Sequence, residues 1–208
     1  MFAGLVLPVL TLNWAARQTE RFNQVLQKSF DAMVILALPL IVGAQLVARP
    51  LMATVAGANF SQSGQVLKIL ILAIGFIFTG CLLSHAVIAL DKQKNIIGAY
   101  VFTAVTSLIG YLIFIPRYSY YGAAWVTVYS EFAIAAFAFY VVFKYSGFRL
   151  NLTVCFKSLA AAAVMGIGVY LLLGKINLVF IILLAAFIYF ISLFLFKGVS
   201  KEDFKLLS

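Results

Sequence analysis

The only carboxylate inside an apolar run of this sequence is that of Glu131. It is the tenth residue of the apolar run from Gly122 to Phe143, which places it about 14 Å along a helix and near the middle of a membrane. A carboxylate there costs at least ~2.5 kcal/mol on insertion scales, so we expect it to face a bundle interior or a wet cavity. Thr127 and Ser130 lie one turn back on the same face. These three residues are candidates for a substrate or coupling-ion path, and a structural hydrogen-bond anchor between helices is the open alternative.

The preceding apolar run carries small and weakly polar residues at helical spacing. The stripe consists of Ala99, Thr103, Thr106, Ser107 and Gly110. Such residues allow close helix packing in membranes, and their hydroxyl groups could equally line a substrate path. Thr103 and Ser107 are the candidate path residues of this stripe. His85, near the end of an earlier run, is either a hydrogen-bonded interfacial histidine or a proton-coupling site.

The sequence contains no catalytic or metal-binding signature. It has one histidine, no paired carboxylates within the apolar runs, no Cys/His cluster at ligand spacing and no Gly-rich phosphate loop. Its two cysteines, Cys81 and Cys155, fall at different membrane depths, which argues against a disulfide. We therefore predict no enzymatic activity, no metal site and no cofactor.

Six apolar runs must position these residues, and each is long enough as a helix to cross a hydrocarbon core of roughly 30 Å. The runs are Ala32 to Ala48, Ile69 to Leu90, Ile96 to Ile115, Gly122 to Phe143, Ser158 to Gly174 and Leu178 to Phe196. Backbone polar groups in lipid must be satisfied within the segment, which leaves the helix as the workable structure. Composition agrees, with 65% hydrophobic and only 10% charged residues. The sequence predicts an all-α, polytopic membrane helix bundle.

The basic residues alternate between rich and poor gaps along the chain. Eleven of the 15 Lys and Arg residues lie before the first run, after the second, after the fourth and after the sixth. The positive-inside rule therefore predicts that these gaps and the C-terminus are cytoplasmic, in a multi-pass protein of the plasma or inner membrane. Because the cations are spread over short loops, we predict membrane lipids and no nucleic acid as partners.

Three further segments carry local predictions. The apolar stretch from Phe2 to Asn13 is too short to span, at about 18 Å, and we interpret it as the last part of a membrane helix in a partial chain. Pro50 to Gly57 is predicted to be a separate, short interfacial helix that ends at Gly57. Leu178 to Phe196 is rich in Phe, Ile and Leu and is predicted to face lipid at the periphery.

Proline at position 39 adds a prediction within the first full run. Pro39 lies mid-run with Gly43 one turn on. Proline removes a backbone donor from a helix, so this pair predicts a kink or a hinge.

Four segments resemble a known family of exporters. Pro116 to Glu131, PRYSYYGAAWVTVYSE, is similar to the signature in the C-terminal half of polysaccharide exporters, where proline ends one helix and Gly-Ala-Ala opens the next. The others are the loop GANFSQSGQVLKIL at Gly57 to Leu70, the basic turn ALDKQK at Ala89 to Lys94, and the "LPL…P" helix at Leu38 to Pro50. In this order they resemble the lipid-linked oligosaccharide flippases of polysaccharide biosynthesis, O-antigen translocases included, over most of Leu5 to Lys144.

This resemblance implies a fold and an activity. The family belongs to the superfamily that also holds multidrug extruders, and its members have two pseudo-symmetric helix bundles. By that likeness residues 1–144 form part of the C-terminal bundle, and residues 145–208 form two peripheral membrane helices and a cytoplasmic tail. The implied activity is translocation of a polyprenyl-pyrophosphate-linked oligosaccharide by alternating access, with polysaccharide assembly machinery as a further partner.

Three other functions stay open at this stage, and one of them is an intramembrane enzyme that uses a few residues within the helices. A drug or cation extruder of the same superfamily would place acidic residues in its binding lobe. An inactive remnant, or a helper that packs on another membrane protein, would conserve the helices without a transport path. The sequence also differs from the family in one respect. It does not contain the cavity cations that the other bundle would contribute.

Overall fold

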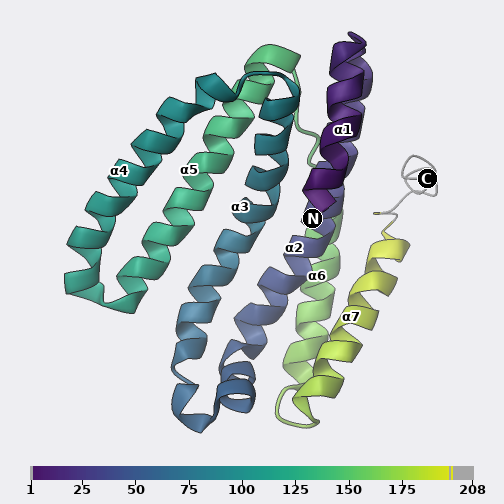
Figure 1. Cartoon of the computed structure of the whole chain (residues 1–208). Helices are drawn as coiled ribbons and strands as arrows, with labels where there is room; N and C mark the ends of the chain where they lie inside the picture. Colours follow the sequence, from purple (N-terminus) through teal and green to yellow (C-terminus); the bar gives the residue numbers. More distant parts are fainter. Residues whose placement is uncertain (1, 197, 199–208) are drawn as a thin grey trace. The chain divides into compact units, whose positions relative to one another are not determined.

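The computed structural model describes residues 2–196 and residue 198, with side chains from Gly4 onward. The described chain contains seven α-helices, one short 3-10 helix and no strand (Figure 1). Six of the helices are long and apolar enough to cross a membrane. The prediction of an all-α, multi-pass membrane helix bundle is therefore confirmed.

Three of the helices extend the predicted runs at both ends, two begin earlier and end slightly earlier than predicted, and the last begins as predicted and ends one residue earlier. The elements are α1 (Phe2–Ala15), α2 (Thr19–Ala56), η1 (Ala58–Phe60), α3 (Ser63–Ala89), α4 (Gln93–Tyr118), α5 (Tyr120–Ser146), α6 (Thr153–Leu172) and α7 (Leu178–Leu195). Helix α2 shows the largest extension, because its first turns are polar and continue the helix beyond the apolar run. Apolar length predicts a spanning segment but does not limit the helix to it.

The prediction of a separate interfacial helix at residues 50–57 is wrong. Helix α2 continues without interruption past Pro39 and Pro50 and ends at Ala56. Gly57, with φ of 100°, ends it as expected. The physical reason is that each proline removes one backbone hydrogen bond, a loss that neighbouring groups in a long helix can compensate.

The helices form two compact units, which we describe separately. Unit 1 comprises the described residues up to Met33 together with Leu72–Asn151, and unit 2 comprises Val34–Ile71 with the described residues from Leu152 onward. The boundary falls inside α2 and α3, so each of these helices contributes to both units. The predicted division of the sequence at residue 144 is of a different kind and stays a prediction.

Unit 1 contains α1, the first part of α2, the second part of α3, and the α4–α5 hairpin. Helices α4 and α5 lie side by side in Figure 1. At the C-terminal end of α5, the following loop is tied to α2. The side-chain amide of Gln27 donates to the backbone oxygen of Asn151 at 2.9 Å and accepts from its backbone nitrogen at 3.0 Å. Asn23 donates to the carbonyl oxygen of Ser146 at 3.1 Å.

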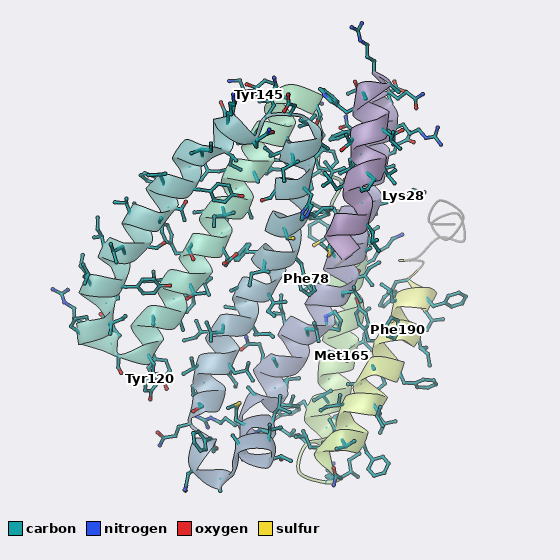
Figure 2. The ribbon with its side chains drawn as sticks, viewed as in Figure 1. Lys28, Phe78, Tyr120, Tyr145, Met165 and Phe190 are labelled. Carbon is teal, nitrogen blue, oxygen red and sulfur yellow. The ribbon has the colours of Figure 1, made fainter. Side chains whose placement is uncertain are left out.

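Unit 2 contains the later part of α2, the first part of α3, and α6 with α7. Its core is a cluster of Val47, Ala161, Ala162, Met165, Val169, Ile181, Tyr189 and Leu193. Most of the remaining surface of α7 is exposed, and Phe190 points outward in Figure 2. One apolar face of α7 is therefore free to meet lipid, in agreement with its composition.

Candidate functional site

All six predicted path residues lie in unit 1, on three of its helices. His85 lies on α3, Thr103 and Ser107 on α4, and Thr127, Ser130 and Glu131 on α5. The geometry of the α4–α5 hairpin determines how most of them are presented. Their role in a transport path stays a prediction.

A one-residue turn and a glycine position α4 against α5. Ser119 alone separates the two helices and adopts a φ of 52°. Gly122, one turn into α5, lies against the backbone carbonyl group of Phe114, and a methyl group at this position would overlap it. Further along, a methyl group on Gly110 would lie 3.1 Å from the Val126 side chain. The small residues of α4 thus allow the two helices to approach closely.

Two pairs of hydroxyl groups join α4 to α5. The Tyr111 hydroxyl lies 3.3 Å from the Thr127 hydroxyl, and the Thr106 hydroxyl lies 3.0 Å from that of Tyr129. Each threonine already donates its proton to a carbonyl oxygen of its own helix, at 3.1 Å for Thr127 and 2.9 Å for Thr106. In this arrangement the tyrosines donate and the threonine oxygens accept. The tyrosine oxygens keep acceptor capacity for a further partner.

Thr103 and Ser107 lie on the buried face of α4. Only 3% of Thr103 and 7% of Ser107 is exposed. Neither hydroxyl group has a hydrogen-bond partner among the described residues. Both residues therefore lie in the packed part of the hairpin, on the same stripe as Gly110. Small side chains are needed there because the two helices approach closely. A role in a substrate path stays a prediction.

Glu131 is only partly buried, whereas two residues further along its face of α5 are buried. Ala135 and Ala138, one and two turns on along the same face, are 7% and 0% exposed. Ala135 packs closely on α3, where a methyl group at Gly80 would lie 3.3 Å from its side chain. Ser130 does not hold Glu131, because its hydroxyl donates to the carbonyl oxygen of Thr127 at 2.9 Å. Within the described part of unit 1 the Glu131 carboxylate has no hydrogen-bond or ion-pair partner.

His85 has a defined hydrogen bond. Its Nδ1 atom lies 2.7 Å from the carbonyl oxygen of Cys81, one turn earlier in α3. A carbonyl oxygen can only accept, so Nδ1 is the donor in this contact. On the adjacent residue, the Ser84 hydroxyl lies 3.0 Å from the Tyr100 hydroxyl and joins α3 to α4. These contacts fit a hydrogen-bonded histidine, and its coupling role stays a prediction.

Sequence reasoning missed a groove between α4 and α5. Its volume is about 790 Å³. It is lined by Asn95, Gly98, Ala99, Phe102, Ala136, Phe137, Tyr140, Val141, Lys144 and Tyr145. The groove lies where α4 begins and α5 ends, and Figure 2 shows Tyr145 at this end of the hairpin and Tyr120 at the other. The available signal is Tyr145 next to Lys144, but the sequence connects the loop lysines only with topology and with lipid headgroups in general, not with a particular groove.

Two lysines and an asparagine converge on Tyr145 at the end of this groove. The Lys92 ammonium group lies 5.0 Å from the centre of the Tyr145 ring, and that of Lys144 lies 5.7 Å from it. Asn95 donates a hydrogen bond to the Tyr145 hydroxyl. Cations close to an aromatic face are attracted by its quadrupole, which explains why both ammonium groups gather there.

The part of the chain that the structure describes holds no group of metal ligands, and the comparisons with known proteins identify no family. Among the described residues, no group of three or more His, Cys, Asp or Glu side chains could hold a metal ion. The chain matches no model of a known protein family, and no curated protein is similar to it.

Proposed function

We propose that this chain belongs to a transporter that moves a polyprenyl-pyrophosphate-linked oligosaccharide across a membrane for polysaccharide biosynthesis. The observation that carries the proposal is Glu131, a partly exposed carboxyl without a partner in unit 1, inside the segment that most resembles the flippase family. A membrane-embedded ionisable residue is a candidate functional group by default. The polar head of such a lipid cannot cross hydrocarbon unaided, so a helix bundle with an accessible polar face suits the task.

The proposed mechanism is alternating access without bond making or breaking. The substrate head would move along polar side chains while its lipid tail stays in the bilayer. The free acceptor positions of Tyr111 and Tyr129, together with the Glu131 carboxylate, are groups that could bind sugar hydroxyls or a coupling cation in turn. A drug or cation extruder is the second candidate, because an unpaired carboxylate also suits an organic cation.

Variants of Glu131 test this proposal directly. In the native reading frame that encodes this chain, Glu131→Gln keeps the size and hydrogen bonding of the side chain but removes its charge. We expect it to abolish surface polysaccharide in a strain that lacks the corresponding flippase, at normal membrane protein level. Glu131→Ala, measured beside it, should fail equally. Wild-type polysaccharide from the Gln variant would contradict a role for the charge, and loss of organic-cation efflux instead would favour the extruder.

The orientation is also part of the proposal, and single cysteines test it. In a background without the two native cysteines, Asn59→Cys and Ser119→Cys should react with an impermeant reagent added outside intact cells. Gln93→Cys and Arg149→Cys should react only after the membrane is opened, because the positive-inside rule places these loops in the cytoplasm. All four positions are exposed. Labelling of Gln93→Cys in intact cells would reverse the orientation.

A further inference from the structure

The groove between α4 and α5 combines an apolar length with a cationic end. Phe102 and Phe137 contribute an edge-to-face pair of rings with centroids 6.1 Å apart. The small residues Gly98, Ala99 and Ala136 line the same groove and leave room in it. Its volume of about 790 Å³ lies within the range of typical small-molecule sites. Phe102 and Tyr140 are 54% and 60% exposed, so the groove opens on the surface of unit 1.

The cationic end lacks acidic partners. Neither the Lys92 nor the Lys144 ammonium group forms an ion pair with a described residue, and both lie within 6 Å of the centre of one tyrosine ring. The nearest carboxylate along the chain, that of Asp91, accepts a hydrogen bond from the Gln93 side chain at 3.1 Å. Two like charges held on one ring repel each other, and an anion bound between them would relieve that repulsion.

We propose that this groove binds an anionic phospholipid, with the phosphate group at Lys92 and Lys144 and one acyl chain along Phe102, Phe137 and Tyr140. The apolar lining suits an acyl chain, because hydrocarbon packs against the aromatic rings by van der Waals contact. The lysine ammonium groups suit a phosphate as point charges. A positively charged ligand would meet repulsion at the same place.

The polar groups at the end of the groove favour a bulk phospholipid over a sugar-bearing lipid. Besides the lysines, the end offers Asn95 and the Tyr145 hydroxyl, and these two are hydrogen-bonded to each other. A large sugar head presents many hydroxyl groups, whereas the lining of the groove is mostly apolar and has few polar side chains, those of Asn95, Tyr140, Lys144 and Tyr145. The assignment is independent of the transported substrate, because the groove is separate from Glu131 along α5.

Lipid retention by the purified full chain tests the proposal. Native mass spectrometry in detergent would measure the apparent affinity for palmitoyl-oleoyl phosphatidylglycerol and for the zwitterionic phosphatidylcholine with the same chains. Lys92→Gln/Lys144→Gln should weaken phosphatidylglycerol retention about 30-fold, since each lysine near a headgroup contributes roughly a fivefold effect. Arg117→Gln/Lys175→Gln removes two exposed positive charges elsewhere and should leave retention unchanged.

A second variant separates lipid binding from folding. Ala136→Leu places a larger side chain in the groove without removing a charge and should also weaken lipid retention. The Ala136→Leu variant and the double-lysine variant should both keep the monodisperse elution of the wild type. Equal retention by the wild type and the double-lysine variant would overturn the proposal, as would unchanged retention by a folded Ala136→Leu variant. Tighter retention of a polyprenyl monophosphate than of phosphatidylglycerol would overturn the choice of phospholipid. Displacement of the lipid by inorganic phosphate alone would show a free-anion site instead.

Discussion

The two units use polar side chains between helices in different ways. In unit 1, the hydroxyls of Tyr111 and Tyr129 meet threonine hydroxyls on the facing helix. In unit 2, a side chain meets a backbone carbonyl: the Tyr189 hydroxyl donates to the oxygen of Ile35 at 2.8 Å, and Gln45 donates to the oxygen of Lys68 at 2.8 Å. Unit 2 therefore uses these polar groups to satisfy the backbone, as unit 1 does with Gln27 and Asn23 at the end of α5. The α4–α5 hairpin of unit 1 differs, because it keeps side-chain acceptors available for another partner.

Tyr189 has a specific reason to bond with Ile35. Pro39 lies four residues after Ile35 in α2 and has no N–H to donate to that carbonyl oxygen. Inside a membrane an unsatisfied carbonyl is costly, so another donor must take the place of the missing N–H. The Tyr189 hydroxyl, buried in the core of unit 2, supplies that donor. This contact explains how α2 continues through Pro39.

Glycine substitutions should have the largest effect on both units. Gly122→Ala would press a methyl group against the backbone of Phe114 in unit 1, and Gly64→Ala would place one 2.7 Å from the Cα atom of Arg49 in unit 2. Because backbone atoms cannot move aside cheaply, we expect a loss of about 1–3 kcal/mol in each case. The measurement is the free energy of unfolding in detergent micelles.

Gly4→Ala is the matched control for these substitutions. No atom lies within 4 Å of the methyl group that it would add, and Gly4 is exposed on α1. Its effect should stay within about 0.5 kcal/mol. A Gly122→Ala variant as stable as this control would mean that the hairpin does not depend on close contact at its turn.

The helices were predictable from the sequence because lipid leaves few alternatives. An apolar run long enough to cross a membrane must satisfy its own backbone, so run length identified all six spanning helices. The ends were less predictable, because polar turns such as those after Thr19 extend a helix beyond the membrane without an apolar signal. The continuation of α2 through Pro50 was also not predictable, because it depends on which neighbouring groups compensate for the missing backbone hydrogen bond.

The site was predictable only in part. Helical spacing correctly groups Thr127 with Glu131 on one face of α5, because spacing along a helix fixes direction. The tyrosine partner of Thr127 depends on which face of α4 meets α5, and that face follows from the packing of the two helices around the turn at Ser119. The groove depends on Lys92 and Tyr145 meeting across two helix ends, a contact that no local pattern predicts.

Removing the Tyr189 hydroxyl should have an intermediate effect that depends on Pro39. Tyr189→Phe leaves the Ile35 carbonyl without its donor and should cost about 1 kcal/mol. In a Pro39→Ala background the new N–H can bond with that carbonyl, so the same substitution should cost little. A double-mutant cycle of unfolding free energies measures this coupling.

An exposed tyrosine of the same unit controls for the loss of a hydroxyl group itself. Tyr170 on α6 is 71% exposed, and Tyr170→Phe should leave stability unchanged in both backgrounds. Additive effects of Tyr189→Phe and Pro39→Ala would show that the hydroxyl does not replace the missing backbone donor.

The smallest effects should come from the tyrosine hydroxyls of unit 1. In Tyr111→Phe and Tyr129→Phe no donor is left unsatisfied, because the partner threonines already donate to their own helix. Each variant should therefore lose about 0.6 kcal/mol of stability, the average of interhelical hydrogen bonds in membranes. Tyr118→Phe, an exposed position at the end of α4, is the control. If these hydroxyls form part of a transport path, surface polysaccharide should fall in the two variants at unchanged protein level. A stability loss larger than that of Tyr189→Phe would instead place the structural hydrogen bonds in unit 1 and reverse the contrast between the units.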